Sequence, residues 1–354
     1  MLIAIYGRPA MNIREIAKRA KVSTATASRA INRIPNVDPH MAKRVRKAVE
    51  ELGYYPNSHA RSLGSGKSRT FGLIVSEISN TFSAEVAQAF EDVAVQHDYE
   101  ILITSTVHDR TRMEMGVRRM IERRVDGVAV LTFGAEESLI AALRLKQIPV
   151  VFVGVGLDSP GVSNIRIDYE HGIRQAVQHV AALRHVEIAF VTGPAHLKVE
   201  AARKTTFQEC MQEIGMQVRP DMAVVSEHTV EGGMRAFDAL RRLSTRPTAV
   251  LCSNDMTAIG IIRRAHECGV SIPFDMSVVG FDDIPLAQFT IPPLTTVQVS
   301  QTELAKLAFQ ALLSEAEDKS EVAEKREYTL ITNLILRGST ALADSEVSLL
   351  PSAS

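Results

Sequence analysis

Residues 11–63 read MNIREIAKRAKVSTATASRAINRIPNVDPHMAKRVRKAVEELGYYPNSHARSL, and their pattern predicts three short helices. Asn12 can cap a helix over NIREIAKRA, and Ser23 can cap a second helix over TATASRAIN. Asp38, followed by proline, begins a third helix over MAKRVRKAVEELG, which Gly53 ends. Apolar residues recur at helical spacing in all three segments, so we expect them to pack against one another.

The turn between the first two predicted helices is short, since only Lys21 and Val22 separate the first helix from Ser23. Small and hydroxylated residues lead the second helix, which would let it lie deep in a groove. This arrangement is typical of a helix-turn-helix, in which the second helix enters the major groove of DNA. In the third helix we expect an apolar stripe of Met41, Val45, Ala48, Val49 and Leu52.

Charge separates this N-terminal segment from the rest of the chain. Residues 1–69 contain 14 Lys and Arg against 4 Asp and Glu, whereas residues 70–354 contain 26 against 37. The overall net charge of −1 therefore conceals a basic head and an acidic body. A basic head of this kind favours a polyanion as its partner.

Composition places the chain among globular proteins of two or three domains, because it has 354 residues, 45% of them hydrophobic and 23% charged. The longest apolar runs, such as 148–155, are far shorter than the roughly 20 residues of a membrane-spanning helix. The N-terminal LIAIY is too short for a signal-peptide core, so we expect a cytoplasmic protein without a membrane partner. Met11 is a candidate start, which would make residues 1–10 an N-terminal extension. The isolated cysteines are expected to be reduced thiols.

From Thr70 onward, apolar runs alternate with helix-length amphipathic segments, which indicates an α/β fold. The runs in the first half are 71–76, 99–105, 125–131 and 149–154, and those in the second half are 187–193, 222–227, 248–254 and 276–283. Two successive doubly wound units with parallel sheets predict two lobes and a cleft where strand carboxyl ends meet. Such a cleft binds small molecules.

The run VSTATASRAIN at 22–32, followed by PNSHARSL at 56–63, resembles the lactose/galactose repressor (LacI/GalR) family, and nearly the whole chain fits the layout of that family. The resemblance implies a transcriptional regulator, most often a repressor: a helix-turn-helix headpiece joined to a two-lobed core like that of periplasmic binding proteins. It implies a pseudo-palindromic double-stranded operator, a small-molecule effector and a homodimer as partners. The tail ADSEVSLLPSAS has no sustained heptad, so we expect no tetramer bundle.

In that family the chain crosses three times between the lobes, which sets the expected domain boundaries. They are 1–10 for the extension, 11–56 for the headpiece, 57–69 for the hinge and linker, 70–167 with about 299–327 for the first lobe, 168–298 with about 328–340 for the second, and 341–354 for the tail.

The resemblance also assigns candidate DNA contacts. We expect Thr24, Ala25 and Arg29 to meet base edges, with Arg29 best suited to guanine. Phosphate contacts are expected from Ser23, Thr26, Ser28, Asn32 and Asn57. The hinge would enter the minor groove through His59, Ala60 and Leu63, with Leu63 as an apolar wedge. His59 departs from the family, in which an aliphatic residue is common there.

Position-by-position matching to the family gives candidate effector contacts: Phe82, Asp168, Arg203, His228, Asn254 and Asp282. Arg203 carries a planar donor fork suited to hydroxyls or carboxylates, and Asp282 is the expected acceptor. For Asp168 an equal alternative is the capping of the following helix.

Some positions depart from the family. Gly154 stands where several relatives have aspartate, and Leu197 and Val199 occupy positions that are polar in the purine-type relatives. These departures argue against a purine but do not identify a ligand. A sugar or sugar acid is expected because such effectors are the most frequent in the family that the chain resembles.

Two other classes of protein were weighed. A solute-binding or sensor protein would share the lobes but would need a signal peptide and no headpiece. An α/β enzyme would need a catalytic or cofactor constellation, and none is found. GSGKS at 64–68 has Arg61 where a phosphate-binding loop needs Gly, and GVGLDS at 154–159 has Ser159 where a dinucleotide fingerprint needs Gly. The histidines at 171, 179 and 185 are read as surface residues, so no metal or cofactor is expected.

Overall fold

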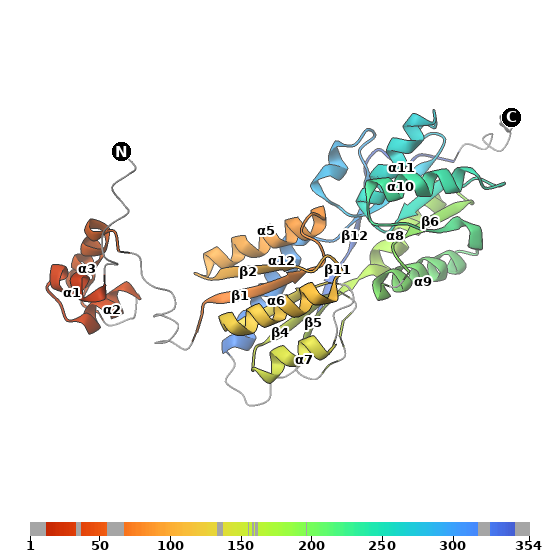
Figure 1. The fold of residues 1–354 in the computed structure, drawn as a ribbon. Coiled ribbons are helices and arrows are strands. Elements are labelled where there is room, and N and C mark those ends of the chain that lie inside the picture. The colour runs from red at the N-terminus through yellow and green to blue at the C-terminus, as the bar shows by residue number, and fades with distance from the viewer. Residues whose placement is uncertain are drawn as a thin grey trace. The chain divides into compact units, whose positions relative to one another are not determined.

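The computed structural model describes residues 12–32, 37–54, 67–132, 137–154, 156–157, 159, 162–195, 197–317 and 326–343. Contacts divide the chain into two compact units, Met1–Arg69 and Thr70–Ser354. Figure 1 shows the small helical unit and the larger α/β unit, each of which is considered by itself. Among the described residues, no helix is both long enough and apolar enough to cross a membrane.

The headpiece consists of α1 (Ile13–Ala20), α2 (Thr24–Ile31) and α3 (Pro39–Leu52). The expected caps are confirmed. The side chain of Asn12 accepts hydrogen bonds from the amides of Arg14 and Glu15, and that of Ser23 accepts one from Thr26. The two-residue turn is possible because Lys21, at φ 52°, adopts the left-handed conformation.

A small apolar core holds the three helices together, and its fully buried members are Ile16, Ala17, Ala20, Ala27, Val45 and Ala48. Alanines at most of these positions let the helices approach closely. Arg44 of α3 strengthens the packing, because its Nε and Nη2 donate to the carbonyl of Ala20 at 2.9 and 2.6 Å. The expectation for Met41 is wrong: its side chain is 41% exposed, because the core is already closed by the next turn of α3.

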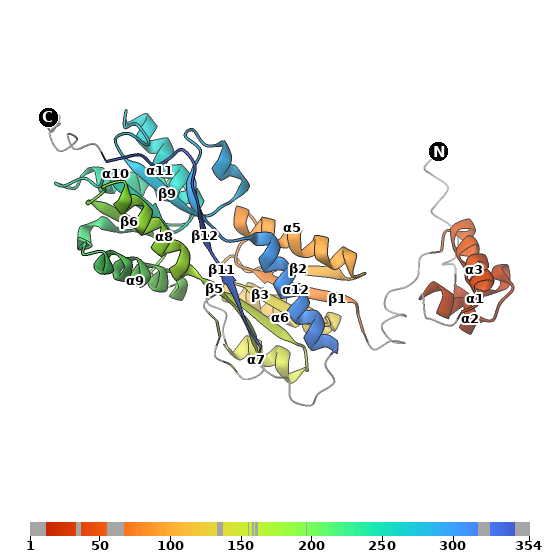
Figure 2. The ribbon, with the colours of Figure 1, turned by 180° about the vertical axis from the view of Figure 1, so that it is seen from behind.

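The larger unit contains two six-stranded sheets. Figures 1 and 2 show the two lobes to which these sheets belong. The first sheet has the order β11-β5-β4-β3-β1-β2 and the second β12-β10-β9-β8-β6-β7. All neighbouring strands run parallel except β10 and β12, which are antiparallel. The strands of the first sheet are β1 (Thr70–Val75), β2 (Glu100–Ser105), β3 (Gly127–Leu131), β4 (Val150–Gly154), β5 (Ser163–Asp168) and β11 (Glu327–Ile331). Those of the second are β6 (Ile188–Thr192), β7 (Ala223–Val225), β8 (Ala249–Cys252), β9 (Ser277–Asp282), β10 (Thr295–Gln298) and β12 (Asn333–Ile335).

Helices cover both faces of each sheet, which explains why the inner strands β1, β3, β4, β6 and β8 are mostly apolar. The first sheet lies between α5 (Thr81–Gln96) with α12 (Gln301–Glu317) on one face and α6 (Arg110–Arg123) with α7 (Glu137–Leu145) on the other. The second lies between α8 (Tyr169–Ala182) with α9 (Lys198–Glu213) and α10 (Val230–Arg241) with α11 (Asp255–Glu267). Two short 3-10 helices, Pro220–Met222 and Pro285–Phe289, complete the second lobe. The expected doubly wound lobes are confirmed.

The chain passes between the lobes at three places: after β5, after β10 and between β11 and β12 (Figure 2). The buried Thr332 ties two of these segments together, since its hydroxyl donates to the carbonyl of Asp168 at 2.6 Å and accepts from the amide of Gly172 at 3.0 Å. The third passage lies at Thr332, a few residues later than the boundary expected near 327–328. Only Thr332 separates the short strands β11 and β12, so the sequence does not mark the residue at which the chain changes sheet.

Candidate functional site

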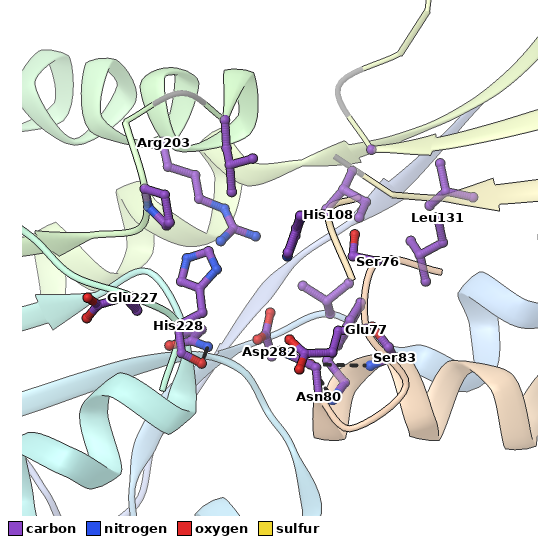
Figure 3. A pocket seen from close by; sticks show the side chains of 18 of the residues that line it. Ser76, Glu77, Asn80, Ser83, His108, Leu131, Arg203, Glu227, His228 and Asp282 are labelled. Carbon is purple, nitrogen blue, oxygen red and sulfur yellow. Dashed lines mark hydrogen bonds between the residues drawn. The ribbon is translucent and has the colours of Figure 1, made fainter. Parts of the chain in front are cut away.

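A cavity of about 320 Å³ lies between the two lobes of the larger unit, and Figure 3 shows it at close range. The first lobe contributes Ser76, Glu77, Asn80, Phe82, Ser83, His108, Leu131, Val153, Gly154 and Ile167. The second lobe contributes Tyr169, Pro194, Leu197, Arg203, Glu227, His228, Thr229, Asn254, Asp282 and Val299. Apolar walls with a few polar groups are typical of sites for small organic molecules.

The position of the cavity follows from the parallel sheets. Ser76 follows β1, Asn254 follows β8, Asp282 ends β9 and Val299 follows β10. Carboxyl ends of parallel strands open at one edge of a sheet, and the two sheets turn these edges toward one another. Side chains more than 200 residues apart therefore meet in one place.

Arg203, on α9, is the cationic centre of the second-lobe wall, and its guanidinium reaches the cavity beside His228 (Figure 3). Its Cζ lies 4.5 Å from the ring centroid of Tyr169 and 4.5 Å from that of Phe281, so two aromatic faces hold the guanidinium. Nη1 donates to the carbonyl of Ser253 at 2.7 Å. These contacts fix Arg203 in place before any ligand binds.

Two residues beside Arg203, Tyr169 and Glu200, were not among the six expected effector contacts. Tyr169 lines the cavity, and burial raises the pKa of its phenol, so this side chain is a neutral hydroxyl. Glu200 lies one turn before Arg203 on α9 and is 1% exposed. Its Oε1 accepts from Nη1 of Arg203 at 3.1 Å and lies 3.4 Å from Nε2 of His228. A glutamate on a helix carries no sequence signal of this burial.

Asp282 presents a carboxyl group at the end of β9. Burial raises the pKa of this group well above its ordinary value, although Arg203 acts in the opposite direction. The backbone is strained here, since Asp282 and Asp283 have φ of 108° and 54°. Asp283 secures the turn, because its oxygens accept from Nη2 of Arg337 at 2.6 Å and from Nε2 of Gln298 at 2.8 Å.

Asn254 and Phe82 line the cavity and also stabilise the surrounding structure. The side chain of Asn254 caps α11 by accepting from the amide of Thr257 at 3.0 Å. Phe82, in the first turn of α5 rather than in a loop, packs against apolar clusters of both lobes. The cavity thus brings together five of the six expected effector residues: Phe82, Arg203, His228, Asn254 and Asp282.

Asp168 is the sixth expected residue, and the structure places it outside the cavity lining. Its carboxylate caps α8 by accepting from the amide of His171 at 3.0 Å. The capping alternative is therefore the one that the geometry supports. Gly154 lines the cavity with φ 134°, a conformation that favours glycine. Leu197 also lines the cavity, whereas Val199 is buried in the core.

In the headpiece, Thr24, Ala25 and Arg29 are all exposed on α2, as a base-reading face requires. The expected phosphate contacts already make local bonds: Ser23 and Thr26 join their hydroxyls at 2.8 Å, and Nδ2 of Asn32 donates to Oγ of Ser28 at 3.4 Å. The expected contacts Asn57, His59, Ala60 and Leu63 lie outside the described residues.

No cluster of metal-ligating side chains occurs within the described residues. The surface reading of His185 is wrong, because this residue is 2% exposed. Its ring bonds Oγ1 of Thr248 and Oγ of Ser277, each at 2.9 Å, and the carbonyl of Ala341 at 3.0 Å. His179 is partly buried and bonds Oγ1 of Thr340 at 2.9 Å. These histidines anchor the segment after β12 to the second lobe.

Comparison with known proteins gives two matching families: bacterial regulatory proteins of the lacI family over residues 12–57, and the periplasmic binding protein-like domain over residues 155–340. The chain is 32% identical to the HTH-type transcriptional repressor PurR of Aliivibrio fischeri, over 92% of this chain and 97% of that one. Among solved structures, the transcriptional regulator CelR in complex with cellobiose is similar with 26% identity and a TM-score of 0.70, over 94% of this chain and 100% of that one. The Lac repressor dimer bound to operator and an anti-inducer has the same fold, with 24% identity, a TM-score of 0.83 and the same coverage.

Proposed function

Because this chain belongs to the LacI family of DNA-binding transcriptional repressors, we propose that Thr24, Ala25 and Arg29 read its operator and that the inter-lobe cavity binds the effector that controls it. The relatives are regulators rather than enzymes, and they carry the headpiece that a solute-binding protein lacks. One observation carries the proposal. A single chain joins an exposed recognition helix to two lobes that enclose a cavity lined by Arg203 and Asp282.

The operator contacts are supported by exposure and chemistry. Arg29 can pair in bidentate fashion with a guanine, while Thr24 and Ala25 are short enough for close approach to base edges. Ser23, Thr26, Ser28 and Asn32 flank this face and would hold phosphates. A dimer presents two such helices to two half-sites, so the operator is pseudo-palindromic. The family resemblance alone supports the proposed hinge contacts with DNA, which involve Asn57, His59, Ala60 and Leu63.

The effector is proposed to be a sugar or sugar derivative. Aromatic and aliphatic side chains such as Phe82 and Leu131 would cover its apolar face, and Asp282, Asn254 and His228 would bond its hydroxyls. The similar regulator CelR binds cellobiose. Binding would bias the closure of the lobes, and the operator affinity would follow that bias, since a ligand shifts only an equilibrium whose two states it binds unequally.

The test has two stages and uses the full chain. Operator sequences are first selected from a random DNA library, and a sugar panel is screened by thermal shift, because a ligand of the native state raises the melting temperature. The operator affinity is then measured with and without each compound that binds. We expect a stabilising sugar to change the operator affinity, and Asp282→Asn to weaken the binding of that sugar.

The matched control is Asp92→Asn, which makes the same substitution on the exposed face of α5 and should leave sugar binding unchanged. A bound sugar without any effect on operator affinity would contradict the control function. Equal sugar binding by the Asp282 variant would contradict the proposed site.

A further inference from the structure

Glu200 is a buried carboxylate directly behind the cavity wall, and it does not itself line the cavity. Both of its oxygens are held. Oε2 accepts from the amide of Gly193 at 2.6 Å and from Oγ1 of Thr192 at 3.2 Å. Oε1 accepts from Nη1 of Arg203 at 3.1 Å and lies 3.4 Å from Nε2 of His228. Because donors contact both oxygens of Glu200, its surroundings stabilise a negatively charged carboxylate.

Glu200 is ionised in this environment. Burial by itself raises the pKa of its carboxyl, but Arg203 and His228 together with the amide of Gly193 lower that pKa to about 2. The exposed fractions of the Arg203 and Glu200 side chains are 6% and 1%, so water screens the pair weakly. The charge of Arg203 is therefore matched inside the protein before an effector arrives.

The rest of the wall offers no second fixed cation. Arg203 is the one Lys or Arg among the described residues that line the cavity, and three lining residues are acidic: Glu77, Glu227 and Asp282. Glu227 already pairs with Arg235 at 2.5 Å. A carboxylate entering the cavity would lose its hydration and face a guanidinium that Glu200 already neutralises, with no other lysine or arginine in the described lining to compensate its charge. Burial of an uncompensated charge is costly.

We propose that Glu200 determines the charge class of the effector, so that the cavity accepts neutral polyhydroxylated molecules and rejects their carboxylated counterparts. The proposal rests on the proposed effector function of the cavity and narrows its ligand class. Arg203 keeps donors for hydroxyl or carbonyl oxygens, to which a neutralised guanidinium still binds. Carboxylated ligands are rejected because the cavity has no uncompensated positive charge to pair with them. The specificity thus comes from disfavouring the competing ligand.

The experiment compares neutral sugars with the acids derived from them, namely glucose with glucuronate, galactose with galacturonate, and cellobiose with cellobionate. Affinities are measured by calorimetry and thermal shift on the full chain, at fixed ionic strength and without DNA. For the wild type we expect the neutral member of each pair to bind more tightly. In Glu200→Gln, which keeps the side-chain shape, the ratio of acid to neutral-sugar affinity should rise roughly 10- to 100-fold, the size of a hydrogen bond to a charged group.

Glu209→Gln is the matched control, because it removes the same charge from the exposed face of the same helix and should leave the ratio unchanged. A wild type that prefers the acid of a pair would overturn the proposal, and this measurement holds even if the Glu200 variant does not fold. An unaltered ratio in the folded variant would overturn it as well. These outcomes concern charge preference alone, whereas failure of the proposed function would appear as bound ligand that does not change operator affinity.

Discussion

The surface proposed to read the operator and the cavity proposed to hold the effector are built in opposite ways. The headpiece presents Thr24, Ala25 and Arg29 from one eight-residue helix, and these side chains are exposed. The cavity gathers residues from Ser76 to Val299, and its central arginine is 5% exposed. The geometry of the α2 face therefore depends on a single helix, while the geometry of the cavity depends on the packing of two whole lobes.

This difference predicts where function and stability separate. An exposed contact residue can be changed with little effect on folding, because few native contacts are lost. Replacing a buried member of a charge network destabilises the fold, because its charged partners are left buried without compensation. Variants of the two regions test this contrast.

Arg203→Ala should lower the free energy of unfolding of the core by about 3–5 kcal/mol, because Glu200 would remain buried without its cation. Urea unfolding, followed by the circular dichroism of the α/β unit, measures this change. The double variant Arg203→Met with Glu200→Gln should recover much of the loss. If Arg203→Ala were as stable as the wild type, the cavity residues would be no more important for stability than the exposed residues of the headpiece.

Arg29→Ala should reduce the free energy of specific operator binding by about 1–3 kcal/mol and leave urea unfolding nearly unchanged. Fluorescence anisotropy with the selected operator gives the affinity. The comparison variant is Arg14→Ala, which removes an equally exposed charge from α1. Equal losses for both variants would mean that Arg29 acts through general electrostatics rather than through base contacts.

Ser23→Ala should destabilise the headpiece by about 1 kcal/mol, because the amide of Thr26 loses its capping acceptor at 3.1 Å. Hydrogen exchange of the α2 amides in the full chain reports this local change. Thr24→Ala removes a neighbouring exposed hydroxyl that does not cap the helix and serves as the reference. Identical exchange in the two variants would show that the cap contributes nothing.

The smallest effect concerns pH and the buried His185. Burial lowers the pKa of its ring below the ordinary 6.5, so the unfolded chain binds a proton that the folded chain resists. Stability from this residue is thus complete above about pH 6.5 and declines as the pH falls through that value. His185→Asn should flatten the slope of unfolding free energy between pH 5 and 7, as measured by urea titrations. A slope identical to that of the wild type would remove His185 as its source.

Much of the fold was predictable from local patterns. The caps at Asn12, Ser23 and Asp38 and the alternation of apolar runs with helices each depend on a few neighbouring residues. The strand β5 was missed, because its sequence SNIRID is not an apolar run, and the change of sheet at Thr332 was expected a few residues too early, near 327–328. Met41 and His185 were assigned to the wrong environment, since periodicity says which face a residue occupies but not what covers that face.

For the cavity, family matching identified five lining residues, but it missed Tyr169 and Glu200 and could not separate Asp168 as a contact from Asp168 as a cap. The sequence by itself determined the basic head, the helix-turn-helix and the two α/β lobes, because caps, turns and apolar periodicity act over short distances. Only the tertiary structure decided which charges meet. Whether Glu200 is a solvated helix residue or the buried partner of Arg203 depends on the packing of α9 against Gly193, His228 and the second sheet.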